Sequence, residues 1–205
     1  IGAYALDAAT TGGFNTACGT AALGSNTTGT LNTAFGRSAL NANTTADGNT
    51  AVGYDALTDN TTGTNNVAVG AYALHVNTTS SHLTAVGRSA LLNNSTGTQN
   101  TAVGSNALLS NTTGNYNTAV GYVAADAITT GQYNTAVGRA SLSTNITGDS
   151  NTAIGYKALD QNTVSMNTAV GSQALENNST GTNNAALGEG ALKANTTGSH
   201  NTGIG

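Results

Sequence analysis

The sequence repeats itself every 17 residues, and this period constrains the fold more than any other feature. A glycine that follows an apolar residue recurs thirteen times between Gly2 and Gly205, and eleven of the twelve intervals are 17 residues long. The interval from Gly155 to Gly171 is 16 residues. The unit can be written N-T-A-V-G-x-x-A-L-x-x-N-T-T-G-x-x, with positions 1 to 17. Such an array predicts a repetitive architecture in which each unit packs against its neighbours.

Agreement between the units is close at the apolar and glycine positions. Position 4 is always apolar, position 8 is Ala except at Ser141, and position 9 is Leu except at Ala125. Position 5 is always glycine. We expect these glycines to lie in turns, and those that we single out are Gly19, Gly36, Gly53, Gly70, Gly87, Gly104, Gly121 and Gly138.

The unit is too short for two helices of useful length and fits short strands instead. Its apolar patches, around positions 2–4 and 8–9, are separated by Gly and by the turn-forming segment N-T-T-G. Stacked units can pair these strands in parallel ladders about 4.8 Å apart. We therefore predict an all-β fold, a parallel β-solenoid (β-roll) of about twelve coils with two short strands per coil. Its length would be roughly 55–60 Å by that spacing.

The composition agrees with a thin core spread along an axis. Aromatic residues make up 4% of the chain and charged residues 7%, which leaves too few large side chains for one thick core. The net charge of −4 and the absence of Pro argue against disorder. We treat residues 1–205 as a single repetitive segment, which we expect to be part of a longer chain because both ends stop within a repeat and no polar capping coil is present.

Side-chain alternation predicts two apolar faces. In a strand, positions 3 and 5 point one way and positions 2 and 4 the other, and positions 8 and 9 also point to opposite faces. A thin roll has one interior, so the other face would form an exposed apolar stripe, which soluble monomers avoid. We therefore expect a homo-oligomer. Cys18, which occupies position 4, is interpreted as a buried substitute for Val.

Two asparagine columns are interpreted as ladders of stacked amides. Position 1 is Asn in most units and Leu83 in one; position 12 is Asn except at Ala9 and Ile128. The position 1 residues that we single out for this structural role are Asn32, Asn49, Asn100, Asn117 and Asn134. The position 12 asparagines also form N-x-[ST] sequences, so a row of N-linked glycans is the alternative in a secreted eukaryotic protein, whereas we favour plain turns.

The segment N-T-A-V-G-x-x-A-L resembles the head repeats of trimeric autotransporter adhesins (the YadA-like head), which read roughly N-S-V-A-I-G-x-x-A. It is also similar to the N-T-A-V-G-x-x-A-L-x-x-N-T-T-G arrays of phage tail fibres. The resemblance covers the whole chain and implies a left-handed, trimeric β-roll in an extracellular, cell-surface or virion fibre. The unit here is longer than the usual adhesin repeat.

Several functions find no support in the sequence. Five basic residues cannot form the cationic stripe that nucleic-acid binding requires, and no apolar run is long enough to span a bilayer. The histidines His75, His82 and His200 do not suggest a catalytic triad or a metal site, and the acidic residues are scattered over several positions. We expect no enzyme activity, no metal and no cofactor.

Position 6 carries the side chains that we propose for surface contact. Arg37, Arg88 and Arg139 recur there every 51 residues, and Tyr54, Tyr122 and Tyr156 occupy the same column. Inherited duplication explains the recurrence; contact with a cell-surface glycan or a neighbouring fibre is the functional alternative.

We expect a structural or adhesive fibre segment, the shaft or head of a surface adhesin or tail fibre, whose main partner is a copy of itself. One alternative is an ice-binding solenoid, which we rank lower because the strand threonine at position 2 forms only a single column. The other is a subunit of an extracellular filament that assembles end to end.

Overall fold

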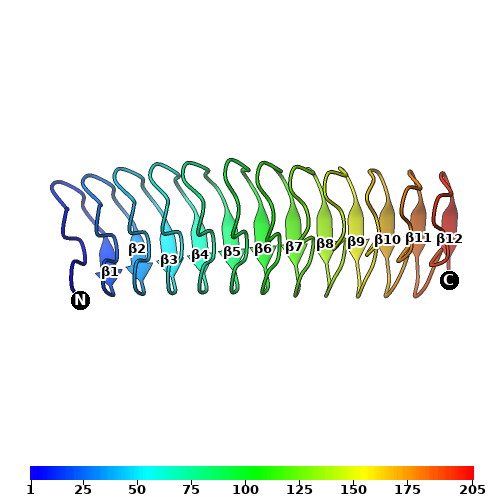
Figure 1. Cartoon of the computed structure of the whole chain (residues 1–205), viewed down its shortest axis with the longest axis horizontal. Helices are drawn as coiled ribbons and strands as arrows, with labels where there is room; N and C mark the ends of the chain where they lie inside the picture. Colours follow the sequence, from blue (N-terminus) through cyan, green and yellow to red (C-terminus); the bar gives the residue numbers. More distant parts are fainter.

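The computed structural model describes all residues from 1 to 205 and confirms an all-β parallel solenoid. Its twelve strands form one sheet in which each strand pairs in parallel with the strands before and after it in sequence (Figure 1). The strands are β1 (Thr16–Cys18), β2 (Thr33–Phe35), β3 (Thr50–Val52), β4 (Val67–Val69), β5 (Thr84–Val86), β6 (Thr101–Val103), β7 (Thr118–Val120), β8 (Thr135–Val137), β9 (Thr152–Ile154), β10 (Thr168–Val170), β11 (Ala185–Leu187) and β12 (Thr202–Ile204).

The register of the sheet follows the repeat. Each strand covers positions 2 to 4, and like positions stand opposite one another, as Thr118, Ala119 and Val120 stand opposite Thr135, Ala136 and Val137. The 16-residue unit does not disturb this pairing, because Ala153 of β9 still lies opposite Ala169 of β10. The missing residue is therefore absorbed in the turn between these strands.

The expectation of a second strand in each coil is wrong. Positions 7 and 9 adopt left-handed backbone angles, as in Ala21 (φ 58°) and Leu23 (φ 50°), so the chain turns tightly where a strand was predicted. The turn directs both Ala22 and Leu23 into the interior, where each has no exposed surface, and not to opposite faces. A left-handed angle costs a non-glycine residue about 1–2 kcal/mol, which burial of the leucine, at roughly 1.5–3 kcal/mol, offsets.

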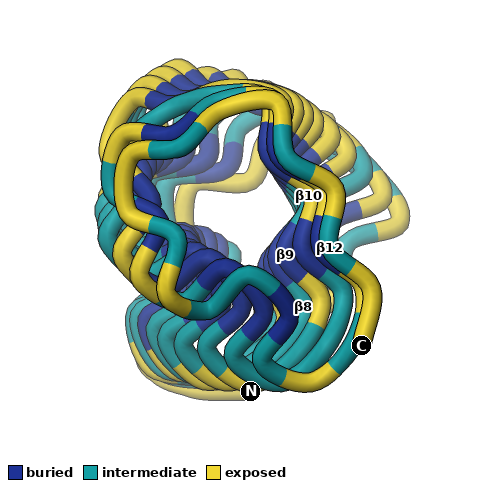
Figure 2. Tube along the Cα trace, turned by 90° about the vertical axis from the view of Figure 1, so that its right-hand side faces the viewer, coloured by how far each residue is buried: buried dark blue, intermediate teal, exposed yellow.

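The core is a thin column that runs the length of the rod. It consists of 32 buried side chains, almost all of them the Ala of positions 3 and 8 and the Leu of position 9. Figure 2, viewed along the rod, shows the buried residues lining the inside of the coil and the exposed residues around its outside. The small size of Ala at two of the three core positions allows the opposite walls of the coil to approach each other.

Glycine at position 5 is required by the coil stacking. Gly121 has a φ of 141°, a conformation that L side chains rarely adopt. A Cβ atom at this residue would also lie 2.5 Å from the carbonyl oxygen of Gly138 in the next coil. Because that oxygen belongs to the backbone, it cannot move aside without disturbing the ladder, and the glycine is fixed in every coil.

Candidate functional site

The outward face of the sheet is a continuous surface of hydroxyl and apolar side chains. Position 3 points into the core, whereas none of the strand residues at positions 2 and 4 is buried. Ten of the twelve position 2 residues are Thr, the exceptions being Val67 and Ala185, and position 4 is apolar in all twelve strands. We call these two columns the Thr/Val face. Cys18 lies on this face and is partly exposed, which corrects its interpretation as a buried residue.

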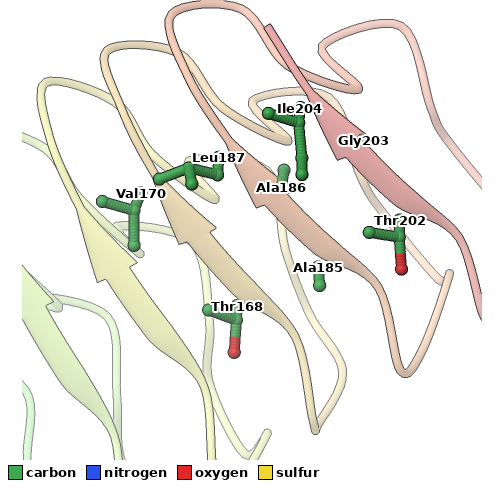
Figure 3. A pocket seen from close by; sticks show the side chains of 8 residues that line it. All are labelled: Thr168, Val170, Ala185, Ala186, Leu187, Thr202, Gly203 and Ile204. Carbon is green, nitrogen blue, oxygen red and sulfur yellow. The ribbon is translucent and has the colours of Figure 1, made fainter.

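Near the C-terminal end the Thr/Val face is hollowed. A depression of about 290 Å³ lies over β10, β11 and β12, and its walls include Thr168, Leu187 and Ile204 (Figure 3). It forms where Ala185 replaces the larger threonine of the other strands. The walls offer no charged group, so this depression suits apolar contact and offers no group for acid–base catalysis.

The position 12 asparagines form an amide ladder inside the rod. The Nδ2 of Asn43 donates to Oδ1 of Asn26 at 2.9 Å, and each later rung repeats this contact up to Asn111, whose Nδ2 donates to Asn94 at 2.8 Å. Each Nδ2 also donates to the carbonyl oxygen three residues later in its own turn, at 3.1 Å for Asn26. The buried Nδ2 atoms are thus already engaged, which argues against glycans at these sequences in the folded chain.

The position 1 asparagines connect the coils in a second way. Oδ1 of Asn32 accepts the backbone N–H of Asn49 at 2.9 Å, and the Nδ2 of Asn49 donates to the carbonyl oxygen of Gly63 at 2.8 Å. Asn117 and Asn134 make the same contact from Oδ1 to backbone N–H, at 3.0 Å. Asn100 holds the following turn in the same manner, through the carbonyl oxygen of Gly114 at 2.7 Å.

The arginines and tyrosines at position 6 lie on the outside of the rod, and two of the arginines stack on tyrosines. Arg37 lies 5.3 Å from the ring centre of Tyr54 on the next coil and donates to its hydroxyl at 3.1 Å. Arg139 lies 5.5 Å from the ring centre of Tyr156 in the same arrangement. Tyr122 is also exposed, and Arg88 is exposed but has Ser105, not a tyrosine, on the following coil.

A column of charged residues at position 10 was not singled out from the sequence. It contains Asp126, Asp160, Glu176 and Lys193 on nearby coils, with Ser143 donating to Asp160. Burial raises the pKa of Asp126, one of whose carboxylate oxygens is buried without a partner. Burial alone would raise the pKa of Glu176, but the ammonium group of Lys193, 3.0 Å away, lowers it. The signal that could have revealed this column is the recurrence of acidic residues at one repeat position.

A second feature missed in the sequence is an aromatic pair at position 17. The rings of Tyr116 and Tyr133 stack with centres 4.9 Å apart and planes 5° from parallel. Both side chains are exposed, and their 17-residue separation was the available signal. The pair lies at the start of β7 and β8 and therefore borders the Thr/Val face.

The histidines are not brought together. His75 packs edge-on against Tyr72 with ring centres 5.7 Å apart, whereas His82 and His200 are exposed residues of position 17 on distant coils. No group of three or more His, Cys, Asp or Glu side chains has an arrangement that could hold a metal ion. The chain has no helix with the length and apolarity needed to cross a membrane.

Comparison of the chain with protein-family models, with curated proteins and with solved structures gave no match. The arguments for function therefore rest on the geometry of the rod.

Proposed function

We propose that this chain is a segment of an extracellular or virion fibre, acting as a shaft or head with no catalytic role. The observation that carries the proposal is the Thr/Val face, which is free of charged residues over all twelve strands although both acidic and basic residues occur elsewhere on the surface. Isolated soluble proteins rarely expose an apolar patch of this extent. The partner that we propose for the face is a second copy of the same face.

The dimensions of the face support self-association. Twelve strands at the usual ladder spacing give a length of about 55 Å, and two side-chain columns give a width of about 10 Å. A pair of such faces would bury roughly 1,100 Å² in total, which is at the lower end of specific interfaces. Three copies around a common axis, the arrangement that the resemblance to adhesin heads implies, would let each copy contact two neighbours and bury more.

Light scattering combined with negative-stain imaging tests the proposal. We expect three copies in a straight particle about 55 Å long per segment, from the ladder spacing. Changing Val103 and Val120 together to Glu should release monomers, because two charges on the Thr/Val face cannot be buried without partners. Thr113→Glu adds a charge at an exposed turn and should leave the mass unchanged. A folded, monodisperse monomer of the natural sequence would refute the proposal.

A second candidate, binding to ice, is favoured by one observation. Position 14 is Thr in all eleven coils that are not shortened, and these side chains are exposed. The exposed threonines at position 2 form another regular column, so the rod presents two such columns and not one. Ice-recrystallisation inhibition by the wild-type chain, lost on changing Thr101, Thr118 and Thr135 to Asp, would support this candidate over the fibre.

A further inference from the structure

The charged residues are segregated around the rod. Four of the five basic residues, Arg37, Arg88, Arg139 and Lys157, lie at positions 6 and 7, immediately after the strands, together with only two of the nine acidic residues. These two columns therefore carry a net charge of +2, whereas the remaining positions hold one lysine and seven acidic residues, a net charge of −6. We call positions 6 and 7 the Arg/Tyr band.

Tyrosines gather in the same band. Five of the seven tyrosines of the chain occupy positions 6 and 7, and they are Tyr4, Tyr54, Tyr72, Tyr122 and Tyr156. Tyr54 and Tyr72 also meet edge to face, with ring centres 5.3 Å apart. A band that concentrates both cations and aromatic rings on an otherwise acidic rod is a surface with two kinds of recognition group in one place.

The arginines of the band remain unpaired although acidic residues outnumber basic ones. Every ion pair in the structure involves Lys157 or Lys193. Lys157, for example, lies 3.5 Å from Asp160, which raises its pKa. The three arginines are exposed and contact no carboxylate, and Arg37 and Arg139 are instead held over tyrosine rings. Stacking restricts the guanidinium group while leaving N–H donors free for a carboxylate from outside.

The spacing of the arginines indicates an extended partner. They lie three coils apart, or about 14 Å at the usual ladder spacing. Nucleic acids carry charges much more densely, about every 3.4 Å along each strand of a duplex, and most phosphates would have no cation opposite them. A polymer with sparse carboxylates and many apolar C–H groups fits better, because sugar rings present C–H faces to aromatic rings and hydroxyls between them.

We propose that the Arg/Tyr band binds an acidic polysaccharide that lies along the rod, with sugar carboxylates on Arg37, Arg88 and Arg139 and sugar rings against Tyr54 and Tyr156. This deepens the adhesive side of the proposed fibre function and rests on it for its biological setting. The contacts are individually weak because they are exposed. Their repetition along one chain, and between copies, provides avidity.

Binding of fluorescently labelled hyaluronan oligosaccharides to the full chain, followed by anisotropy at low salt, tests the proposal. We expect binding that weakens as salt is added, and none to labelled dextran of similar length, which has no charge. Changing Arg37, Arg88 and Arg139 together to Gln should weaken binding at least tenfold. The double change Lys157→Gln and Lys193→Gln is the control for charge, because both lysines are already paired, and should have less than a twofold effect.

The tyrosines supply a second, matched test. Changing Tyr54 and Tyr156 to Ala should weaken binding at least threefold, whereas the same change at Tyr116 and Tyr133, which lie outside the band, should not. The proposal is overturned if the wild-type chain does not bind hyaluronan, if the triple Gln variant binds within twofold of wild type, or if both tyrosine pairs have equal effects. Tighter binding of single-stranded DNA or of dextran would also overturn it.

Light scattering on the same samples separates this proposal from the fibre proposal. Monomers that bind hyaluronan would leave the polysaccharide site standing and refute the fibre, whereas trimers that bind none would do the reverse. Circular dichroism of each variant checks that the solenoid is intact, which we expect because the changed side chains are exposed or only partly buried.

Discussion

The position 12 ladder is continuous in the first half of the rod and interrupted in the second. From Asn26 to Asn111, six successive side chains donate to one another. The next residue in the column is Ile128, and Oδ1 of Asn111 is left buried without a donor. Beyond it, Oδ1 of Asn145 accepts the N–H of Gly148 in its own turn. Both halves keep the same sheet, so backbone pairing alone maintains the fold and the amide ladder adds cohesion between coils.

The largest expected effect comes from breaking the continuous half. Asn77→Leu removes a donor to Oδ1 of Asn60 at 3.0 Å and the acceptor for Asn94 at 3.2 Å, and it leaves a buried oxygen unpaired. We expect a loss of about 2–4 kcal/mol in the free energy of unfolding, measured by urea denaturation. Asn111→Leu is the matched control, because its Oδ1 already has no donor, and it should cost about 1–3 kcal/mol less. Equal losses would mean that the contact between rungs contributes nothing.

Repair of the interruption should have the next largest effect. The coil that contains Ile128 also has Ala125 at the usual leucine position, so the two changes Ala125→Leu and Ile128→Asn together restore the common unit. The new amide would donate to Asn111, and the leucine would fill the core. We expect a gain of about 1–3 kcal/mol in unfolding free energy. Ile128→Asn alone should gain less, because it removes a buried apolar side chain, and a double variant no more stable than wild type would contradict this reading.

A smaller effect is expected at the single break in the position 1 column. Leu83 is buried, and its side chain offers no acceptor for the backbone N–H of Asn100, whereas Asn49 does so for Asn66 at 3.0 Å. Leu83→Asn should therefore raise the unfolding free energy by about 1 kcal/mol. Slower hydrogen exchange at the Asn100 amide would locate the effect, and exchange that stays unchanged would exclude the expected bond.

The smallest effect depends on pH. Because burial raises the pKa of Asp126, the folded chain holds this proton more tightly than the unfolded chain does. The associated stability is present below the ordinary pKa of aspartate and is lost as pH rises through the folded value. Asp126→Asn should therefore raise the Tm slightly at pH 7 and leave it unchanged well below the ordinary pKa. An Asp126→Asn effect that persists in acid would point to a cause other than ionisation.

Much of the architecture could be predicted from the period alone. The 17-residue spacing of Gly and Ala predicts parallel in-register coils, and strand alternation predicts that Thr and Val of positions 2 and 4 share a face. The turn at positions 7 to 9 could not be predicted, because Leu at a left-handed φ contradicts its local preference and is stabilised only by stacking on neighbouring coils. Nor does the sequence reveal which arginines are paired, since that depends on side-chain directions around the rod.

The ladder has a mechanical consequence. Hydrogen bonds between coils run along the long axis of the rod, so tension applied to its two ends loads successive coils in series. Each coil then carries the same force, and extension begins at the weakest junction. The junction between Asn111 and Ile128, where a side-chain bond is missing, is the point at which a stretched rod would first open.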